Sequence, residues 1–312
     1  MSPPKMPPPP LPNADPQEPA RLRSLAVFAP IVAGGEKLPE YERWLGRRIH
    51  GVVDNADETG GWPEMLNSVR FLAQRYQGKP FHLVLGIPMI PYRGGASLAR
   101  GAAGDYDTHH REMARELVRR GMGRCTVRLG WEFNGRWMPW FAGDDPESFK
   151  RYWRRTVDVY RRASPDFRFD WCPTLGRKAM ETDRAWPGAD YVDVIGADVY
   201  NEWWNARSKD DRQARWHDEY IWTPFGLQWQ ISFARQHGKR ISFPEWGTRP
   251  ESAHGGRGGG DDPFFIERMA AWFDAADELM AYHGYFERVD VALSGGLYPR
   301  CAEAFRRLFG RA

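Results

Sequence analysis

Residues 126–140 read TVRLGWEFNGRWMPW, and this segment determines how the rest of the chain is interpreted. Val127 and Leu129 alternate with polar or small residues, which predicts a short β-strand. The dipeptide Asn134-Gly135 predicts the turn that follows it. Glu132 lies between the strand and the turn, so the segment predicts a carboxylate at the carboxyl end of a buried strand.

Short apolar strands alternate with helices along the remainder of the chain. Besides the strand before Glu132, strands are predicted at 25–29, 49–53, 81–87, 167–172, 192–197, 240–244 and 282–287, and helices at 62–76, 106–120, 146–160, 224–237, 263–279 and 302–309. Strands separated by helices are typical of a parallel sheet. We therefore predict an α/β fold, a single-domain (β/α)8 TIM barrel. An open doubly wound sheet is the alternative, but no GxGxxG motif follows the first strand.

Composition and end segments set the limits of this domain. Residues 1–20 are rich in proline and are expected to form a disordered tail, which leaves the barrel at 21–312. Hydrophobic residues make up 42% of the 312 residues and the mean hydropathy is −0.65, as in a soluble globular protein. The three cysteines are far apart and form no CxxC pair, so neither a disulfide framework nor a zinc site is predicted.

The sequence contains no feature typical of a protein that binds nucleic acid or a membrane. The net charge is +3, with charges of both signs interleaved and no recognised nucleic-acid module, so no nucleic-acid partner is expected. No run of about 18 apolar residues occurs, so no membrane partner is expected. The first 20 residues contain no apolar segment typical of a signal peptide, which predicts a cytoplasmic location.

Candidate site residues collect at the predicted carboxyl ends of the strands. In a barrel these ends lie on one face, where functional residues gather. We expect Asp54, Glu132, Asp198, Tyr200 and Glu245 on that face. The chain also has 15 tryptophans, more than a core of this size requires. Aromatic rings stack on the apolar faces of sugars, and carboxylates bind their hydroxyls, so a carbohydrate site is indicated.

Two of these carboxylates, Glu132 and Glu245, suit the hydrolysis of a glycosidic bond. In such sites one carboxyl group donates a proton while the other stays ionised. At a separation of about 5–5.5 Å the ionised group attacks the anomeric carbon and configuration is retained, whereas at about 6.5–9.5 Å a water fits between them and configuration inverts. The sequence alone leaves both outcomes open.

Three segments resemble a known family. The run from Arg128 to Trp140 resembles the acid/base segment of glycoside hydrolase family 26, whose members include β-mannanases. Residues 243–247, FPEWG, are similar to the nucleophile segment at the end of strand seven in the same clan of barrels, and residues 198–201, DVYN, resemble the strand-six segment beside it. The resemblance implies a retaining hydrolase of β-linked polysaccharide or oligosaccharide, with Glu132 as acid/base and Glu245 as nucleophile. It implies no cofactor.

This chain departs from the family pattern at one position. It has Trp131 directly before the proposed acid/base, where the family has histidine. Tryptophan donates only through its indole N–H, so contacts with the sugar differ. The family resemblance also suggests a secreted protein, in contrast to the missing signal peptide.

Other residues near the two glutamates are candidates for substrate binding, and each has a structural alternative. Arg128 pairs with Glu245 or is a structural arginine of the barrel, and Tyr200 hydrogen-bonds Glu245 or is satisfied elsewhere. Trp137, Trp140 and Trp246 are stacking platforms or core residues. Asn134 contacts a sugar hydroxyl or serves only in a turn. The predicted substrate-binding set is completed by Asp54, Trp131 and Asp198, and no catalytic metal is predicted.

Two other functions fit the same residues. A barrel without catalytic activity would bind glycan and not cleave it. A transglycosylase would use the same covalent intermediate but transfer the sugar to another sugar hydroxyl.

Overall fold

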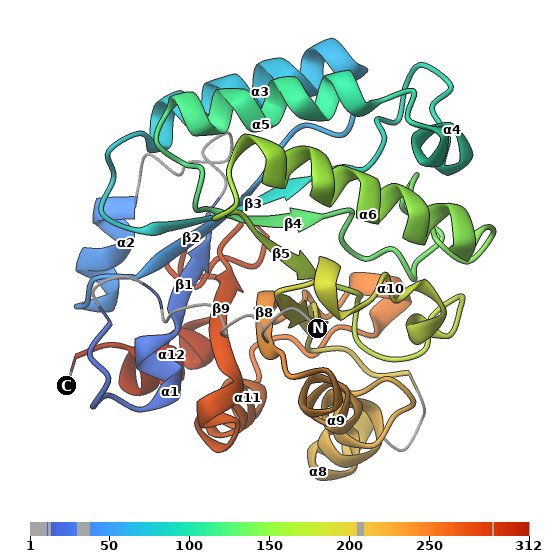
Figure 1. Ribbon diagram of the computed structural model, residues 1–312. Helices are drawn as coiled ribbons and strands as arrows, with labels where there is room; N and C mark the ends of the chain where they lie inside the picture. Colours follow the sequence, from blue (N-terminus) through green and yellow to red (C-terminus); the bar gives the residue numbers. More distant parts are fainter. Residues whose placement is uncertain (1–10, 12–13, 30–37, 205–208, 289, 312) are drawn as a thin grey trace.

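Eight parallel strands close into a barrel with helices around it (Figure 1). The computed structural model describes residues 11, 14–29, 38–204, 209–288 and 290–311. The barrel strands are β1 (Leu25–Phe28), β2 (Gly51–Asn55), β3 (His82–Ile87), β4 (Thr126–Leu129), β5 (Arg168–Trp171), β6 (Val194–Gly196), β8 (Arg240–Gly247) and β9 (Met280–Phe286). Each strand pairs with its neighbour, and the β6–β8 pairing closes the ring, while the short β7 (Val199–Tyr200) adds to β8. The predicted (β/α)8 barrel is confirmed.

Helices connect the strands and cover the outside of the barrel. They are α1 (Ala20–Arg23), α2 (Leu38–Leu45), α3 (Trp62–Tyr76), α4 (Leu98–Ala103), α5 (Asp107–Arg119), α6 (Pro146–Ala163), α8 (Arg212–Arg215), α9 (Leu227–His237), α10 (Ala253–Gly256), α11 (Pro263–Ala275) and α12 (Pro299–Phe309). Short 3-10 or π turns lie at η3 (Thr182–Ala185), η4 (Ala189–Tyr191), η5 (Trp216–Ile221) and η6 (Asp277–Leu279). Helix α4 was not predicted, because its Gly-rich surroundings hide a start at Ser97, whose hydroxyl accepts from the Arg100 N–H.

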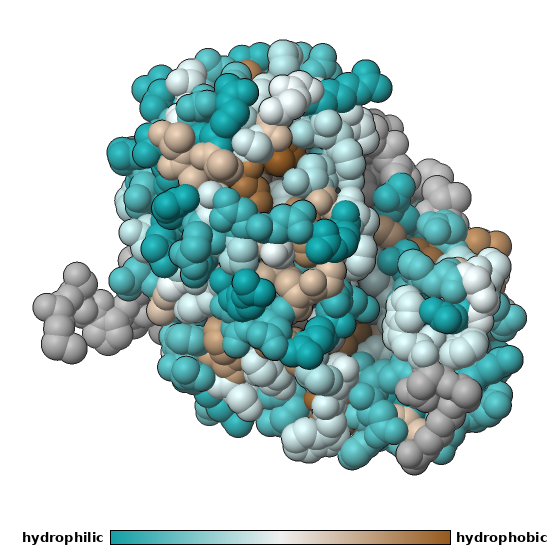
Figure 2. All heavy atoms as spheres, turned by 90° about the vertical axis from the view of Figure 1, so that its right-hand side faces the viewer, coloured by the Kyte–Doolittle hydropathy of each residue, from teal (hydrophilic) through white to brown (hydrophobic). Residues whose placement is uncertain are grey.

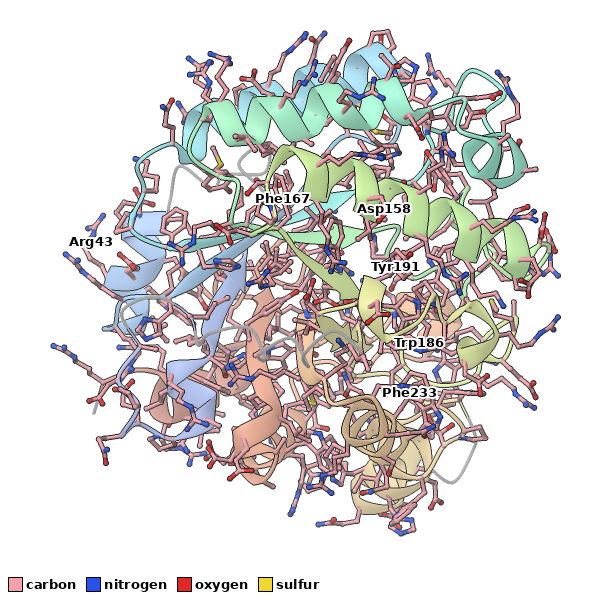
Figure 3. The ribbon with its side chains drawn as sticks, viewed as in Figure 1. Arg43, Asp158, Phe167, Trp186, Tyr191 and Phe233 are labelled. Carbon is pink, nitrogen blue, oxygen red and sulfur yellow. The ribbon has the colours of Figure 1, made fainter. Side chains whose placement is uncertain are left out.

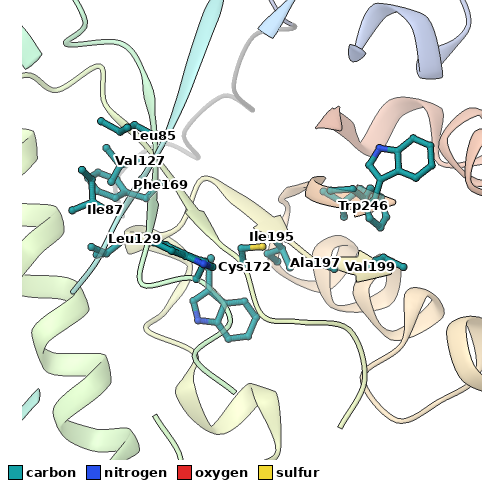
Figure 4. Packing of buried hydrophobic residues seen from close by; sticks show 14 of the residues in the cluster. Leu85, Ile87, Val127, Leu129, Phe169, Cys172, Ile195, Ala197, Val199 and Trp246 are labelled. Carbon is teal, nitrogen blue, oxygen red and sulfur yellow. The ribbon is translucent and has the colours of Figure 1, made fainter. Parts of the chain in front are cut away.

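Alternation along the strands separates an outer core from the interior of the barrel. Figure 4 shows Leu85, Val127, Phe169 and Ile195 of β3 to β6, which pack between the sheet and the helices. Their neighbours along each strand point inward, and the inward residues near the amino ends of the strands form a smaller apolar cluster that includes Val84 and Val194. Each fully buried aliphatic or aromatic side chain of these layers stabilises the fold by about 1.5–3 kcal/mol.

Aromatic contacts fix the helices against the strands. In Figure 3, Trp186, after η3, lies beside Phe233 of α9, and their ring centroids are 5.0 Å apart in an edge-to-face arrangement. Trp186 also meets Trp171 of β5 at 5.1 Å. Helix α6 begins at Pro146, and the preceding Asp145 side chain accepts from the Ser148 N–H, which caps the helix.

A β-bulge in β8, between Phe243 and Trp246, shifts which side chains face the barrel interior. Phe243 and Trp246 both pack on Phe273 of α11, with ring centroids 5.1 and 5.3 Å away, although regular alternation would place them on opposite faces. The register against β9 shifts between these two residues, so β8 contains one extra residue there. Glu245 consequently faces into the barrel and Trp246 faces the helices.

The neighbouring strand makes room for this bulge with a glycine. A Cβ atom on Gly284 of β9 would lie 2.8 Å from the carbonyl oxygen of Pro244 and 3.1 Å from a methyl group of Val53. Proline has no N–H to donate, so it is tolerated where the pairing of the strand is interrupted. Gly284 and Pro244 together permit the local path of β8 that delivers Glu245.

The amino-terminal segment is described only in part. Residues 1–10 and 12–13 of the expected disordered tail lie outside the described residues. Leu11 is buried against the inner apolar cluster, and Glu18 forms an ion pair with Arg47 at 2.7 Å. Among the described residues, no helix is long and apolar enough to cross a lipid bilayer.

Candidate active site

The two glutamates predicted to be catalytic come from strands on opposite sides of the barrel. Glu245 lies in β8, and Glu132 follows the end of β4 by three residues. The backbone of Glu132 has φ +51°, and its N–H donates to the carbonyl oxygen of Cys172 at 2.8 Å, which holds this unusual conformation. Both residues lie at the carboxyl ends of their strands. Figure 2 shows the molecule from the right-hand side of Figure 1, where the surface is hollowed between two parts.

Arg128 joins the acidic residues of the barrel interior. It points inward from β4 and is fully buried. Its Nη1 donates to Oε1 of Glu245 at 2.5 Å, and its Nη2 donates to the carboxylate of Asp198. The two carboxylates raise the pKa of Arg128, although burial opposes this, so the guanidinium stays charged. One buried cation is thus shared between two carboxylates, an arrangement that fixes their positions.

Tyr200 holds the other oxygen of Glu245. Its hydroxyl donates to Oε2 at 2.8 Å. Burial, and then the charge of Glu245, raises the pKa of Tyr200 well above its usual value, so the phenol remains a donor. The guanidinium of Arg249 lies 3.5 Å from the centroid of the Tyr200 ring and packs on it. Glu245 therefore has one fixed donor on each oxygen.

The surroundings of Glu132 differ from those of Glu245. Burial, and then the nearby charge of Glu245, raises the pKa of Glu132. The indole N–H of Trp137 donates to Oε2 of Glu132 at 2.7 Å and partly opposes the rise. Burial and the charge of Glu245 also raise the pKa of Asp198, against the effect of Arg128. The site thus pairs a carboxyl group that favours its protonated form with one held between two donors.

A cleft of about 930 Å³ opens beside Glu132. It is lined by Glu132, Trp137, Thr174, Leu175, Gly176, Arg177, Lys178, Asp198, Val199, Tyr200, Glu202, Trp204, Asp218, Glu219, Tyr220, Thr223, Arg249 and His254. Trp137 and Trp204 expose 51% and 46% of their surface, so their rings are available to a ligand. Another cavity, of about 590 Å³, lies at the amino ends of the strands and is remote from both glutamates.

Three of the predicted aromatic residues are not in this cleft. Trp140 and Trp246 are fully buried and Trp131 is 4% exposed. The Trp140 indole N–H donates to the Trp131 carbonyl oxygen at 2.6 Å, and the Trp246 indole N–H donates to Nδ1 of His283 at 3.1 Å. The prediction that Trp140 and Trp246 are stacking platforms is therefore wrong, and the core alternative describes them. The Trp131 ring lies over Arg128, at 5.3 Å.

Asn134 and Asp54 also have structural roles. The Asn134 amide exchanges hydrogen bonds with the backbone of Thr174, at 2.8 and 3.0 Å, and is fully buried, so it ties two loops together and has no access to a sugar. Asp54 accepts from the Tyr76 hydroxyl of α3 at 2.8 Å and is fully buried. Alternation in β2 turns Asp54 toward the helices, and its predicted place in the site is corrected accordingly.

Sequence reasoning missed several residues of the cleft, among them Lys178, Glu202 and Arg249. Each of these residues follows the carboxyl end of a strand by a few residues. That position was the only sequence signal that could have indicated a place in the cleft. These residues lie in irregular loops, however, where no periodic pattern marks which side chains turn toward the site.

One family model matches part of the chain. The model of glycosyl hydrolase family 26 matches residues 115–217, a range that contains Glu132, Asp198 and Tyr200 and ends before Glu245. No curated protein sequence matches the chain.

Solved structures share the fold at low sequence identity. A Bacillus subtilis mannanase is 11% identical, with TM-score 0.63, covering 94% of this chain and 87% of that chain. A modular endo-beta-1,4-mannanase from Cellulomonas fimi is 16% identical, with TM-score 0.56 and coverage of 84% and 65%. The GH53 catalytic domain of Ignisphaera aggregans is 14% identical, with TM-score 0.61 and coverage of 96% and 100%. Because two glycosidase families appear here, the structural likeness defines the barrel and not the family.

The family match supports a glycoside hydrolase, and the solved structures support the barrel on which its site is built. The family 26 model matches the part of the chain around Glu132, where the sequence itself resembles that family.

Proposed function

We propose that the protein is a retaining glycoside hydrolase that cleaves β-linked polysaccharide or oligosaccharide by double displacement. The observation that carries this proposal is the difference between the two glutamates. Glu245 accepts from Arg128 and Tyr200, whereas burial and the charge of Glu245 raise the pKa of Glu132. A nucleophile must be ionised and a general acid protonated, which is the assignment that these surroundings favour.

In the first step, Glu245 attacks the anomeric carbon while Glu132 gives its proton to the glycosidic oxygen, and the leaving sugar departs. The covalent glycosyl ester that results removes the negative charge of Glu245. The pKa of Glu132 then falls, because this charge is one of its causes. Glu132 can therefore take a proton from the water that releases the sugar, as the second step requires.

The proposed substrate class is a β-linked glycan, with β-mannan as the first candidate. This choice is supported by the family match and by the mannanases among the structures of similar fold. Trp137 stands beside the acid/base and offers an exposed ring on which a sugar can stack.

The test is hydrolysis of β-mannan, β-glucan, β-xylan and bacterial exopolysaccharides by wild type, Glu132→Ala and Glu245→Ala, with circular dichroism to verify folding. We expect one substrate to be cleaved by wild type and by neither variant, with NMR showing that the first product keeps its anomeric configuration. Added azide should restore activity toward an activated substrate, giving the α-azide with Glu245→Ala and the β-azide with Glu132→Ala.

Three results would contradict the proposal in different ways. Equal activity of variants and wild type would remove both glutamates from the mechanism. Inversion of configuration would exclude the covalent intermediate. Binding of a glycan without cleavage would favour the barrel that binds but does not hydrolyse. If products grow longer when an acceptor sugar is added, the same site acts as a transglycosylase.

A further inference from the structure

Lys178 occupies a position in the cleft that the proposed mechanism does not explain. It follows β5 in sequence and lines the cleft together with Glu132 and Trp137. Its Nζ lies 5.1 Å from the centroid of the Trp204 ring. The charges of Glu202, Glu132 and Glu219 act on this ammonium, so it lies within their electrostatic reach.

The side chain of Lys178 is partly buried, and its ammonium has no ionic partner among the described residues. Burial lowers its pKa, which reflects the cost of removing the charged group from water. The other cations that line the cleft do have partners: Arg177 pairs with Glu181, and Arg249 lies 3.4 Å from Glu202. No hydrogen bond or ion pair within the described part of the chain satisfies Lys178. A cation in the cleft without a direct ionic partner suits a ligand that carries a negative charge.

The acidic residues of the cleft are directed to other groups. Glu202 faces Arg249 and Nε2 of His254, the latter at 3.2 Å. Both oxygens of Glu219 accept from the backbone N–H of Trp204, at 2.9 and 3.1 Å. These contacts hold the two carboxylates in place near the ammonium without pairing with it.

We propose that Lys178 forms a subsite for a carboxylate-bearing sugar, a uronate, in the cleft beside Glu132. This inference rests on the proposed function. A uronate supplies a direct ionic partner and a charge-assisted hydrogen bond, whereas a neutral hydroxyl supplies only the hydrogen bond.

Trp204 helps to hold Lys178 ready for such a ligand. Its ring is approached by the Lys178 ammonium at 5.1 Å and by the Arg257 guanidinium at 5.3 Å. Contacts between cations and an indole ring are attractive and orient a flexible lysine without neutralising its charge. The charge therefore remains available to the carboxylate of a sugar.

The test uses pairs of oligosaccharides that differ only in a carboxylate. The first pair is β-1,4-linked mannohexaose and the corresponding mannuronate oligomer, and the second is a xylo-oligosaccharide with and without a glucuronate branch. Binding is measured by calorimetry on Glu245→Ala, which prevents turnover, and on Glu245→Ala combined with Lys178→Met or Lys178→Arg. Methionine keeps the length of the side chain and removes the charge.

We expect at least one uronate ligand to bind more tightly than its neutral partner, and Lys178→Met to weaken it by about ten- to a hundredfold. Lys178→Arg should keep most of the preference, and the neutral ligands should change by less than about threefold. The proposal is overturned if neither pair shows a uronate preference, or if Lys178→Met weakens neutral and acidic ligands equally. Cleavage of neutral glycans without uronate preference would leave the proposed function intact, whereas uronate preference without any cleavage would refute only the function.

Discussion

Arg128 of β4 and Glu245 of β8 meet inside the barrel, with Nη1 of the arginine 2.5 Å from Oε1 of the glutamate. Their strands are separated by β5 and β6 in the ring. The pair therefore links two distant walls of the barrel at the proposed nucleophile. Asp198, held by the same guanidinium, brings the strand-six segment into this linkage.

Replacing Arg128 should damage both stability and activity. Arg128→Met leaves Glu245 and Asp198 buried without their cation, and loss of one partner of a buried pair costs about 3–5 kcal/mol. We expect the free energy of unfolding to fall by that amount and kcat/KM to fall by at least about a hundredfold. Urea unfolding and steady-state kinetics measure the two effects. Arg128→Lys keeps the charge but loses the forked geometry, and should lie between wild type and Arg128→Met. Wild-type kinetics in Arg128→Met would remove this pair from the mechanism.

Gly284→Ala, on the neighbouring strand β9, should displace the proposed nucleophile Glu245 and lower activity. The new Cβ would lie 2.8 Å from the Pro244 carbonyl oxygen and must displace the bulge that directs Glu245. We expect a loss of about 1–3 kcal/mol in stability, together with a lower kcat. The matched control is Gly295→Ala, whose Cβ would lie 3.5 Å from the nearest atom and should leave kinetics unchanged. If both variants retain wild-type kcat, the bulge does not need the glycine.

Trp137→Phe should shift the alkaline limb of the pH–rate profile to higher pH. The indole N–H stabilises the ionised form of Glu132 and so lowers its pKa, which means that its removal raises the pKa. A general acid loses activity as the pH rises through its pKa, so a higher pKa extends the active range upward. The measurement is kcat/KM against pH, with Trp222→Phe as the control, since Trp222 is exposed and outside the cleft lining. A shift in the opposite direction would contradict the assigned hydrogen bond.

Mild acid should destabilise the fold through His110. Burial lowers the pKa of His110 to about 4, below its ordinary value of 6.5. Between about pH 6.5 and 4 this histidine is protonated in the unfolded chain but not in the folded protein. The free energy of unfolding is therefore highest above about pH 6.5 and decreases as the pH falls toward 4. This residue alone should cost about 2 kcal/mol between about pH 7 and pH 5. Urea unfolding of His110→Gln, which retains a donor for Tyr152, should show a smaller loss. His217→Gln, at an exposed position, should behave as wild type, and equal slopes in all three proteins would refute the assignment.

The barrel was predictable because strands and helices alternate in a pattern that depends on local sequence. The same pattern located Glu132 and Glu245 at strand ends, where a barrel gathers its functional groups. Asp54 shows the limit of that reasoning: it lies at a strand end, but alternation turns it toward Tyr76, while Asn55 lies against the inner face of Gly86. Position along a strand is thus insufficient without the face.

Trp246 and Lys178 show two other reasons for failure. Trp246 adjoins Glu245 in sequence and was placed in the site, but neighbouring residues of a strand point to opposite faces, and the bulge gives the inner face to Glu245. Lys178 lies in a loop, and its place in the cleft depends on loops after β5, β6 and β8 that come together only in the folded chain. Long-range packing of this kind leaves no local signal.

The extra residue in β8 has a consequence for how such a barrel can change. If β8 alternated regularly from Phe243 to Trp246 without the bulge, Trp246 would turn into the mouth of the barrel and the carboxylate of Glu245 would turn toward the helices. Deleting one residue between Phe243 and Trp246 would instead leave Trp246 on the helix side, because the two residues would then be two positions apart and share a face. The added residue therefore changes the length of the strand, and the bulge that absorbs it preserves the side on which each later residue lies.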